Sequence, residues 1–175
     1  MAEVHKIDYW PPYSVGYGGA GGSSRYDGDE SKVASSTKEF RLTVHGEPVA
    51  KGRPKLATVR GRAMAFTPKK TRNYEDIVRH TAVREWNSAP VLRDVPIRLS
   101  AKFFRSIPAS WSAKKQQAAL AGLIRPITRP DWDNLGKSIT DALNGVVYLD
   151  DALIVSSTVE KFYAVEPRVE IILCW

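Results

Sequence analysis

The stretch "TRPDWDNLGKSITDALNGVVYLDD", residues 128–151, concentrates five aspartates in a chain whose formal net charge is +7. Two explanations are possible for so many acidic residues in one stretch. The carboxylates either cap a helix and keep its exposed side in water, or they hold a cation that the chemistry of the protein needs. The stretch therefore decides both the local fold and the function.

The order of residues in this stretch predicts an extended segment followed by a helix. The residue before a proline is pushed out of the helical region, so the chain from Thr128 to Pro130 is expected to be extended. Asp133 is the expected N-cap, and Asn144 with Gly145 is the expected helix end. Four apolar residues then share one side of the helix: Leu135, Ile139, Ala142 and Leu143.

The opposite side of this helix carries charge. At about 100° per residue, Asp133, Lys137 and Asp141 fall together there. Ion pairs at i,i+4 spacing would stabilise an exposed helix by roughly a few tenths of a kcal/mol per pair. Such a ladder explains Asp133 and Lys137 without a metal, and it assigns Asp141 to surface charge.

The ladder does not explain the other acids. Residues two apart in an extended chain point to the same side, so Asp131 and Asp133 can converge beside the helix N-terminus. Asp150 and Asp151 are adjacent, so an extended backbone would send only one of them toward this pair. Two like charges about 4 Å apart repel by roughly 1–4 kcal/mol, a cost that a cation would remove.

An oxygen-only ligand set of this kind suits Mg²⁺ or Mn²⁺, with coordination positions left for water and phosphate. Such a metal site would hydrolyse phosphodiesters. Lys137, one turn along the helix, would add positive charge where the transition state accumulates negative charge. From spacing alone, the metal site and the solvated helix both remain open.

The sequence on either side of the stretch predicts strands and helices. Apolar and polar residues alternate in "EFRLTVHG" and "VPIRLSAKFF", and β-branched and aromatic residues dominate "ALIVSSTVEKFYA" and "RVEIILCW". Helices are expected from Thr67 (the cap) and Pro68 to about Trp86, and from Ser112 to Gly122. Because these elements interleave without the repeat of a doubly wound sheet, we expect an α/β (α+β) fold with one mixed sheet packed by helices.

Residues 1–38 differ in composition from the rest of the chain. They are rich in Gly, Ser and Tyr without periodicity, and we interpret them as a flexible tail before a single domain at residues 39–175. A formal G-x-G-x-x-G match within them lacks the flanking strand and helix of a dinucleotide site. This segment holds four basic and five acidic residues, so residues 39–175 carry the positive charge, a net +8.

Composition excludes several classes of protein. A single cysteine, Cys174, and three scattered histidines exclude an internal disulfide and a zinc finger. No apolar run is long enough to span a bilayer, and the N-terminus lacks the apolar core of a signal peptide, so we expect a cytoplasmic protein without a membrane. A pI near 9.6 favours a polyanionic partner such as nucleic acid.

The positive charge is densest in "KGRPKLATVRGRAMAFTPKKTR", residues 51–72, which holds eight Lys and Arg residues and no acid. Its glycines and prolines suggest a loop or hairpin. A basic run is commonly only a solvated face, but uncompensated cations repel one another unless phosphates are near. We therefore expect phosphate contacts from this segment.

The acidic stretch as a whole resembles the signature of the RusA family of Holliday junction resolvases, R-P-D-x-D-N-x-x-K followed by D-A-L-N and a D-D pair. The resemblance extends outward to "GEPVAKGRPKL", "SIPASWSAKK" and "VEKFYAVEPRVEIIL". It covers about residues 39–173 and leaves the tail outside.

The resemblance has one departure within the helix. Gly136 occupies a position that usually holds a better helix former. Either a close approach of DNA or of a neighbouring chain, or tolerated helix weakness, would account for this glycine.

The resemblance implies a Mg²⁺-dependent crossover junction endodeoxyribonuclease, active in DNA recombination and repair as a homodimer on four-way junctions, and often encoded by phages or prophages. It assigns metal binding to Asp131, Asp133 and Asp151, with Asp150 in support, and catalysis to the same three aspartates and Lys137. From charge, we expect DNA contacts from Lys51, Arg53, Lys55, Arg60, Arg62 and Arg129.

Two other functions agree with the sequence. A DNA-binding module could keep the basic surface without cutting, and a nuclease of this family could act on flaps, forks or other branched DNA. The complete set of Asp131, Asp133, Lys137 and Asp151 speaks against a module that no longer cuts.

Overall fold

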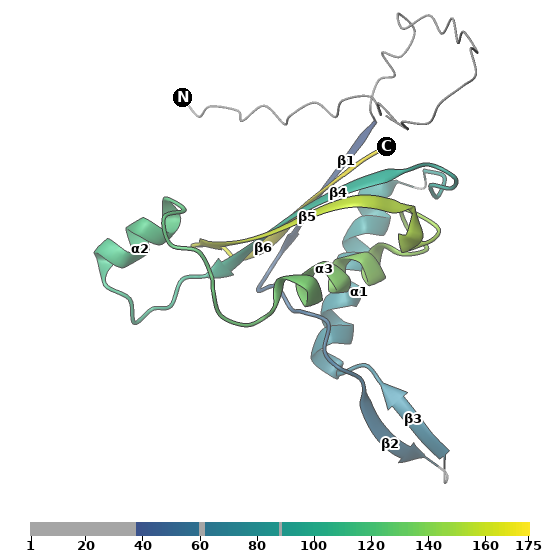
Figure 1. Cartoon of the computed structure of the whole chain (residues 1–175), viewed down its shortest axis with the longest axis horizontal. Coiled ribbons are helices and arrows are strands. Elements are labelled where there is room, and N and C mark those ends of the chain that lie inside the picture. Colours follow the sequence, from purple (N-terminus) through teal and green to yellow (C-terminus); the bar gives the residue numbers. More distant parts are fainter. Residues whose placement is uncertain (1–37, 60–61, 88) are drawn as a thin grey trace, which may run out of the picture. The chain divides into compact units, whose positions relative to one another are not determined.

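The computed structural model describes residues 38–59, 62–87 and 89–175, so the prediction of a flexible tail lies, except for Lys38, outside the described residues. The elements follow one another along the chain as Figure 1 labels them. They are β1 (Glu39–His45), β2 (Lys55–Val59), β3 (Arg62–Phe66), α1 (Lys69–Trp86), β4 (Ile97–Ser106), α2 (Ala113–Leu120), α3 (Trp132–Leu143), the 3₁₀ turn η2 (Asp151–Leu153), β5 (Ile154–Ala164) and β6 (Arg168–Cys174).

Four strands form one mixed sheet in the order β1-β6-β4-β5. β6 pairs antiparallel with both β1 and β4, whereas β4 and β5 are parallel. A parallel pair needs a long crossover connection, and here that connection contains α2, α3 and η2. The prediction of one mixed sheet packed by helices is confirmed.

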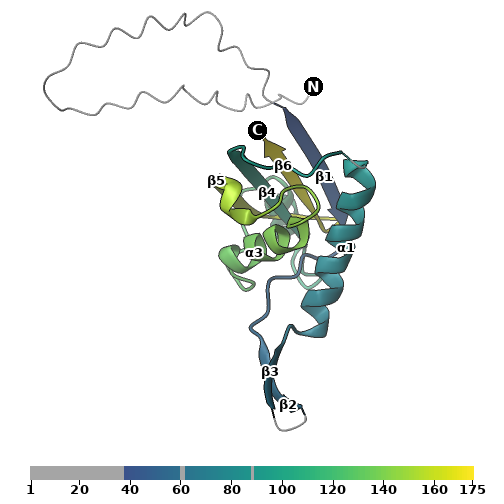
Figure 2. The same cartoon turned by 90° about the vertical axis from the view of Figure 1, so that its right-hand side faces the viewer.

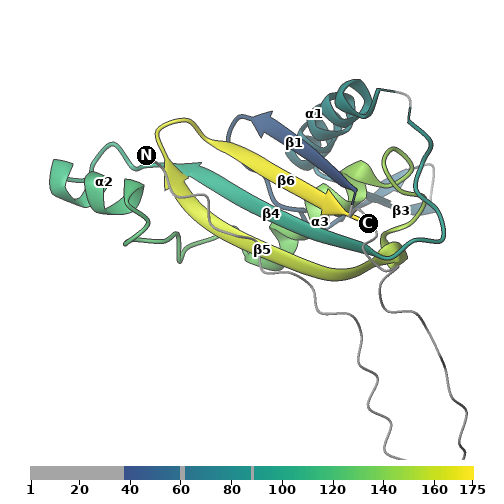
Figure 3. The ribbon, with the colours of Figure 1, turned by 90° about the horizontal axis from the view of Figure 1, so that it is seen from above.

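Helices α1 and α3 lie on the same face of this sheet (Figures 2 and 3). The alternating apolar residues of the strands turn toward the helices, and burying each large one contributes roughly 1.5–3 kcal/mol. The core contains, among others, Leu42, Val44, Ile97, Leu99, Phe103, Val169, Ile171 and Leu173 from the sheet, with Val78, Ala82, Leu135, Ile139 and Leu143 from the helices. α3 therefore buries its apolar side in a core that it shares with α1 and the sheet.

Gly136 lies on the buried side of α3 and explains how closely this helix approaches the sheet. A Cβ atom at this position would lie 3.2 Å from Cγ2 of Val159 on β5. The glycine thus lets α3 pack tightly against the edge strand of its own sheet. This contact gives the departure at Gly136 a reason within the chain.

The basic segment forms a β-hairpin with its own two-stranded sheet, β2 paired antiparallel with β3. It extends away from the four-stranded sheet in Figures 1 and 2. Every residue of β3 is exposed. The prediction of a loop or hairpin is confirmed, and Arg53 before β2 and Arg62 at the start of β3 are exposed.

Helix ends agree with the sequence to within a residue, apart from the start of α3. α1 begins at Lys69 with Pro68 as its N-cap, so the prediction of Thr67 as the cap is wrong by one residue. Pro68 has a ψ of 140°, which is extended rather than helical. α2 follows Ser112 and ends before Gly122, whose φ of 75° is left-handed.

No helix in the described ranges is long and apolar enough to cross a membrane.

Candidate active site

Basic side chains of the sheet hold the segment that leads into α3. Arg105 of β4 donates from Nη1 to the backbone oxygen of Arg129 at 2.8 Å. Lys161 of β5 donates from Nζ to the backbone oxygens of Thr128 and Pro130, at 3.1 and 3.2 Å. The Arg129–Pro130 peptide bond is cis. The position of the following acidic residues is thus tied to the two parallel strands.

α3 begins two residues earlier than the sequence predicted. Asp131 is the N-cap, with φ −70° and ψ 148°, and Asp133 lies in the first helical turn. The prediction of Asp133 as N-cap is wrong, because Pro130 restricts only the residue before it and a helix can begin directly after Asp131. An acid in the first turn is favoured by the helix dipole. The Asp131 side chain makes no capping hydrogen bond.

The two adjacent aspartates before β5 turn to different partners. Asp150 caps η2, its Oδ1 accepting from the backbone N–H of Ala152 at 2.8 Å. Asp151 instead accepts at Oδ2 from Nζ of Lys137, at 3.1 Å. Of the two adjacent acids, Asp151 is the one that contacts α3, through Lys137; its approach to the Asp131–Asp133 pair stays a prediction.

Lys137 is the residue that joins these acids. Its Nζ lies 2.8 Å from Oδ1 of Asp141, one turn further along α3, as well as within hydrogen-bond distance of Asp151. The hydrogen bond to Asp141 and then that to Asp151 raise the pKa of Lys137 above its ordinary value. The amine is therefore fully charged at neutral pH and restricted by carboxylates from two elements.

Asp141 is more than surface charge. Its Oδ2 lies 2.7 Å from Nζ of Lys51, which comes from the connection between β1 and β2. Burial acts to raise the pKa of Asp141, but the hydrogen bonds from Lys137 and Lys51 outweigh it and lower the pKa below its ordinary value. The predicted i,i+4 ion pair between Lys137 and Asp141 is confirmed. Asp141 also forms an ion pair with Lys51, which the sequence spacing could not predict.

Lys51 has compensating carboxylates, unlike the uncompensated cation that the sequence suggested. Besides Asp141, its Nζ lies 2.7 Å from Oε1 of Glu75 on α1. Burial acts to lower the pKa of Lys51, and the hydrogen bonds to Asp141 and Glu75 outweigh it and raise the pKa. A DNA contact by Lys51 stays a prediction, but the structure gives this charge partners within the chain.

We call Lys51, Glu75, Lys137, Asp141 and Asp151 the ion-pair cluster. It carries three negative and two positive charges, and therefore a net negative charge. Sequence reasoning missed Glu75, although a signal existed. Glu75 shares the side of α1 that buries Thr71 and Val78, and an acid on the buried side of a helix needs a partner.

The candidate metal ligands fit Mg²⁺ by chemistry. They are carboxylates, the oxygen donors that Mg²⁺ prefers, and Asp131 and Asp133 are exposed. Within the described part of this single chain, however, no three acidic, histidine or cysteine side chains are grouped closely enough to hold a metal ion. Asp133 is helical and only Asp131 is extended, so the extended-chain geometry from which the sequence argument placed this D-x-D pair does not apply.

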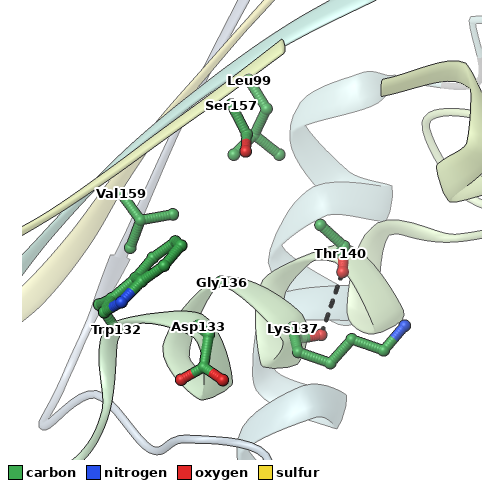
Figure 4. A pocket seen from close by; sticks show the side chains of 8 residues that line it. All are labelled: Leu99, Trp132, Asp133, Gly136, Lys137, Thr140, Ser157 and Val159. Atoms are coloured by element: carbon green, nitrogen blue, oxygen red, sulfur yellow. Dashed lines mark hydrogen bonds between the residues drawn. The ribbon is translucent and has the colours of Figure 1, made fainter. Parts of the chain in front are cut away.

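An open pocket of about 220 Å³ lies between α3 and the parallel strands β4 and β5 (Figure 4). The exposed indole of Trp132, the residue between the two aspartates, lines it together with Leu99, Asp133, Gly136, Lys137, Thr140, Ser157 and Val159. The first turns of α3 thus border a space accessible from solvent.

Three other predicted DNA contacts whose side chains the structure describes, Arg53, Arg62 and Arg129, take no part in the ion-pair cluster. Arg53 and Arg62 are exposed at the base and tip of the hairpin, and Arg129 is exposed just before α3. Lys55 begins β2, and Arg60 lies outside the described residues. The exposed arginines are placed on the surface, where phosphates could reach them.

Comparison with known proteins connects this arrangement to a family. The family model described as "Endodeoxyribonuclease RusA" matches residues 45–173, which include every element from β2 to β5 and most of β6. The chain is also 38% identical over 136 residues to the uncharacterized protein YqaN of Bacillus subtilis (strain 168), covering 77% of this chain and 94% of that protein. The matched region contains the helix start with Asp131 and Asp133, the central Lys137 and the Asp150–Asp151 pair. The chain therefore belongs to the RusA family of endodeoxyribonucleases.

Proposed function

We propose that this protein is a structure-selective endonuclease that resolves four-way DNA junctions by Mg²⁺-dependent phosphodiester hydrolysis in DNA recombination and repair. The observation that carries the proposal is the contact of Lys137 on α3 with Asp151 of η2, in a chain of the RusA family. It joins the middle of α3 to the final aspartate of the acidic stretch, residues 128–151. A solvated helix alone would not require this contact.

Asp131, Asp133 and Asp151 would hold the Mg²⁺, or Mn²⁺ in its place, with Asp150 supporting the turn that presents Asp151. A bound Mg²⁺ polarises the phosphate and lowers the pKa of the attacking water. Lys137 presents a positive charge, oriented by its two carboxylates, to the phosphate that gains negative charge in the transition state.

DNA would be bound by the exposed basic groups around this site. Arg129 lies directly before the N-terminus of α3, and the hairpin carries Arg53 and Arg62 into solvent. A four-way junction has two equivalent strands to cut, so a homodimer with one site per chain matches its symmetry. We infer that the protein works where such DNA occurs, in the cytoplasm of a bacterium or of a phage-infected cell.

A synthetic four-way junction with labelled arms tests the proposal. The wild-type chain should cut the junction in paired positions with Mg²⁺, should bind without cutting in EDTA, and should leave linear duplex intact. Asp131→Asn should bind the junction and not cut it. Equal cutting of linear duplex and junction would remove structure selectivity, and faster cutting of flaps or forks would change the substrate to another branched DNA.

A non-cleaving junction-binding module is the second candidate. It is favoured by the finding that the described residues of one chain hold no ready group of three metal ligands. Junction binding that never leads to cleavage, with Mg²⁺ or Mn²⁺ and at protein concentrations high enough for a dimer, would establish this alternative and refute the nuclease.

A further inference from the structure

Lys137 has two carboxylate partners with different tasks. Asp151 is a candidate metal ligand, and its Oδ2 contacts Lys137 at 3.1 Å. Asp141 is not a candidate ligand, and its Oδ1 lies closer to the same amine, at 2.8 Å. If Asp151 turns toward a cation, only Asp141 continues to hold the amine in place.

Asp141 is itself restrained at three atoms. Oδ1 contacts Lys137, and Oδ2 lies 2.7 Å from Nζ of Lys51. Its backbone oxygen accepts from Nη2 of Arg79 on α1 at 3.2 Å. The carboxylate cannot rotate without losing one of two short ion pairs, so its position relative to α3 is defined.

Lys51 is suited to hold Asp141 because its backbone is anchored. Its N–H donates to the backbone oxygen of Asn134 in α3 at 2.8 Å, and its Nζ also contacts Glu75. The following residue, Gly52, donates from its N–H to Oγ1 of Thr71 at 3.1 Å. A Cβ atom at Gly52 would lie 2.9 Å from both this hydroxyl and Cγ of Pro68, so the connection fits tightly against the start of α1.

We propose that Asp141 is a positioning residue for Lys137, and that Lys51, held by Glu75, fixes Asp141 in turn. The inference rests on the proposed nuclease function, since it gives Lys137 a fixed place while Asp151 serves the metal. This proposal separates the basic residues by role. Lys51 affects the reaction through Asp141, whereas the exposed arginines bind DNA.

A purely stabilising ion-pair cluster is the competing explanation. Ion pairs of partly buried groups frequently contribute little net stability, because desolvation opposes their attraction. The two explanations differ in what the removal of Asp141 changes. A stabilising role predicts a lower free energy of unfolding, whereas a positioning role predicts a lower cleavage rate at unchanged junction affinity.

The first experiment compares Asp141→Asn, Asp141→Glu and Lys51→Met with wild type in single-turnover cleavage of a saturating junction with Mg²⁺. Asp141→Asn should lower the rate constant by about 10- to 100-fold, the cost of misplacing a group by roughly 1 Å, with the junction Kd within about twofold. Asp141→Glu should recover part of the rate, and Lys51→Met should lose less than Asp141→Asn. Glu85→Gln, an equivalent change at the exposed ion pair of Glu85 with Arg84 on α1, should leave the rate unchanged.

The second experiment tests the contact between Lys137 and Asp141 without measuring cleavage. The full chain is treated with an amine-acylating reagent, and labelling of Lys137 is followed by mass spectrometry of its peptide. Asp141→Asn should speed labelling of Lys137 on the order of threefold to tenfold, because an amine released from a carboxylate reacts more readily. Labelling of the exposed Lys69 serves as the internal control and should not change.

Failure of this inference is distinguishable from failure of the proposed function. A wild-type chain that cuts no branched DNA refutes the nuclease, whereas an active wild type with an equally active Asp141→Asn refutes the positioning role alone. Unchanged labelling of Lys137 in Asp141→Asn also refutes it. If Asp141→Asn and Lys51→Met both fail to fold, the cluster is a stability element and the positioning role is overturned.

Discussion

The acidic stretch and the basic hairpin carry opposite charges and are built in opposite ways. In residues 128–151, α3 buries Leu135, Ile139 and Leu143 completely and holds its charged residues in defined contacts. In the hairpin, Leu56 is 79% exposed and Arg62 is exposed as well. Lys51, which precedes the hairpin, belongs by its contacts to the acidic region.

This difference suggests a division of work between the two regions. Catalysis needs groups held at fixed positions, and the packing of α3 on the sheet provides this. Binding to the phosphate backbone needs only positive charge that is free to follow the DNA. Changes in the acidic region should therefore alter the cleavage rate, whereas changes in the hairpin should alter affinity.

Lys137→Ala should give the largest effect. We expect the single-turnover rate to fall by about 10²- to 10³-fold, the scale observed when one transition-state-stabilising group is removed. The junction Kd should stay within about threefold of wild type, because the amine is occupied by Asp141 and Asp151. Cleavage kinetics and electrophoretic mobility shift, measured on the same protein preparation, check this. A loss of affinity that matches the loss of rate would make Lys137 a binding residue.

The next largest expected effect is a difference in stability between a core variant of α3 and a variant of the exposed hairpin. Leu135→Ala on α3 should lower the free energy of unfolding by about 2–5 kcal/mol, because Leu135 is completely buried. Leu56→Ala in the hairpin should change it by less than about 0.5 kcal/mol, because that side chain is 79% exposed. Urea unfolding followed by circular dichroism gives both values. Similar losses for the two variants would show that the hairpin packs against something in solution.

Removing hairpin charge should change affinity alone. The double variant Arg53→Ala and Arg62→Ala should raise the Kd for junction and for duplex by similar factors, about 3- to 10-fold, and should lower the salt dependence of binding by roughly one unit of slope per lost phosphate contact. The cleavage rate at saturating junction should not change. A selective loss on the junction would instead indicate that these arginines recognise branched structure.

The sequence predicted the fold well because its periodicity is strong. Alternation in Leu42, Val44 and in the strand that begins at Ile97 identified two strands that bury one side against α1 and α3. The long resemblance around the acidic stretch identified the family, and the family model confirmed it. Both signals are local, and local pattern is what a single sequence expresses most directly.

The contacts that define the candidate site were not predictable in the same way. Lys51 and Glu75 are 24 positions apart in the chain, and Lys51 and Asp141 are further apart still. No spacing rule brings such residues together, because their contact depends on how the connection after β1 meets α1 and α3. The start of α3 was misplaced for a different reason, since both Asp131 and Asp133 are good N-cap residues and only packing chooses between them.

The smallest expected effect is a pH dependence confined to the acidic region. Hydrogen bonds from Lys137 and Lys51 outweigh burial and keep the pKa of Asp141 below 3.8, its ordinary value. A carboxyl with a lowered pKa in the folded state contributes stability above its ordinary pKa, and this contribution disappears as pH falls through the folded-state pKa. The free energy of unfolding of wild type should therefore decrease more steeply between about pH 5 and about pH 2 than that of Asp141→Asn.

The matched control for this pH dependence comes from the hairpin. Arg62→Ala should give a curve parallel to that of wild type, because an arginine keeps its charge throughout this range. Urea unfolding at each pH provides the comparison. Parallel curves for wild type and Asp141→Asn would mean that Lys137 and Lys51 do not hold this carboxylate in solution. The acidic region would then not differ from the basic hairpin in having Asp141 held by ion pairs.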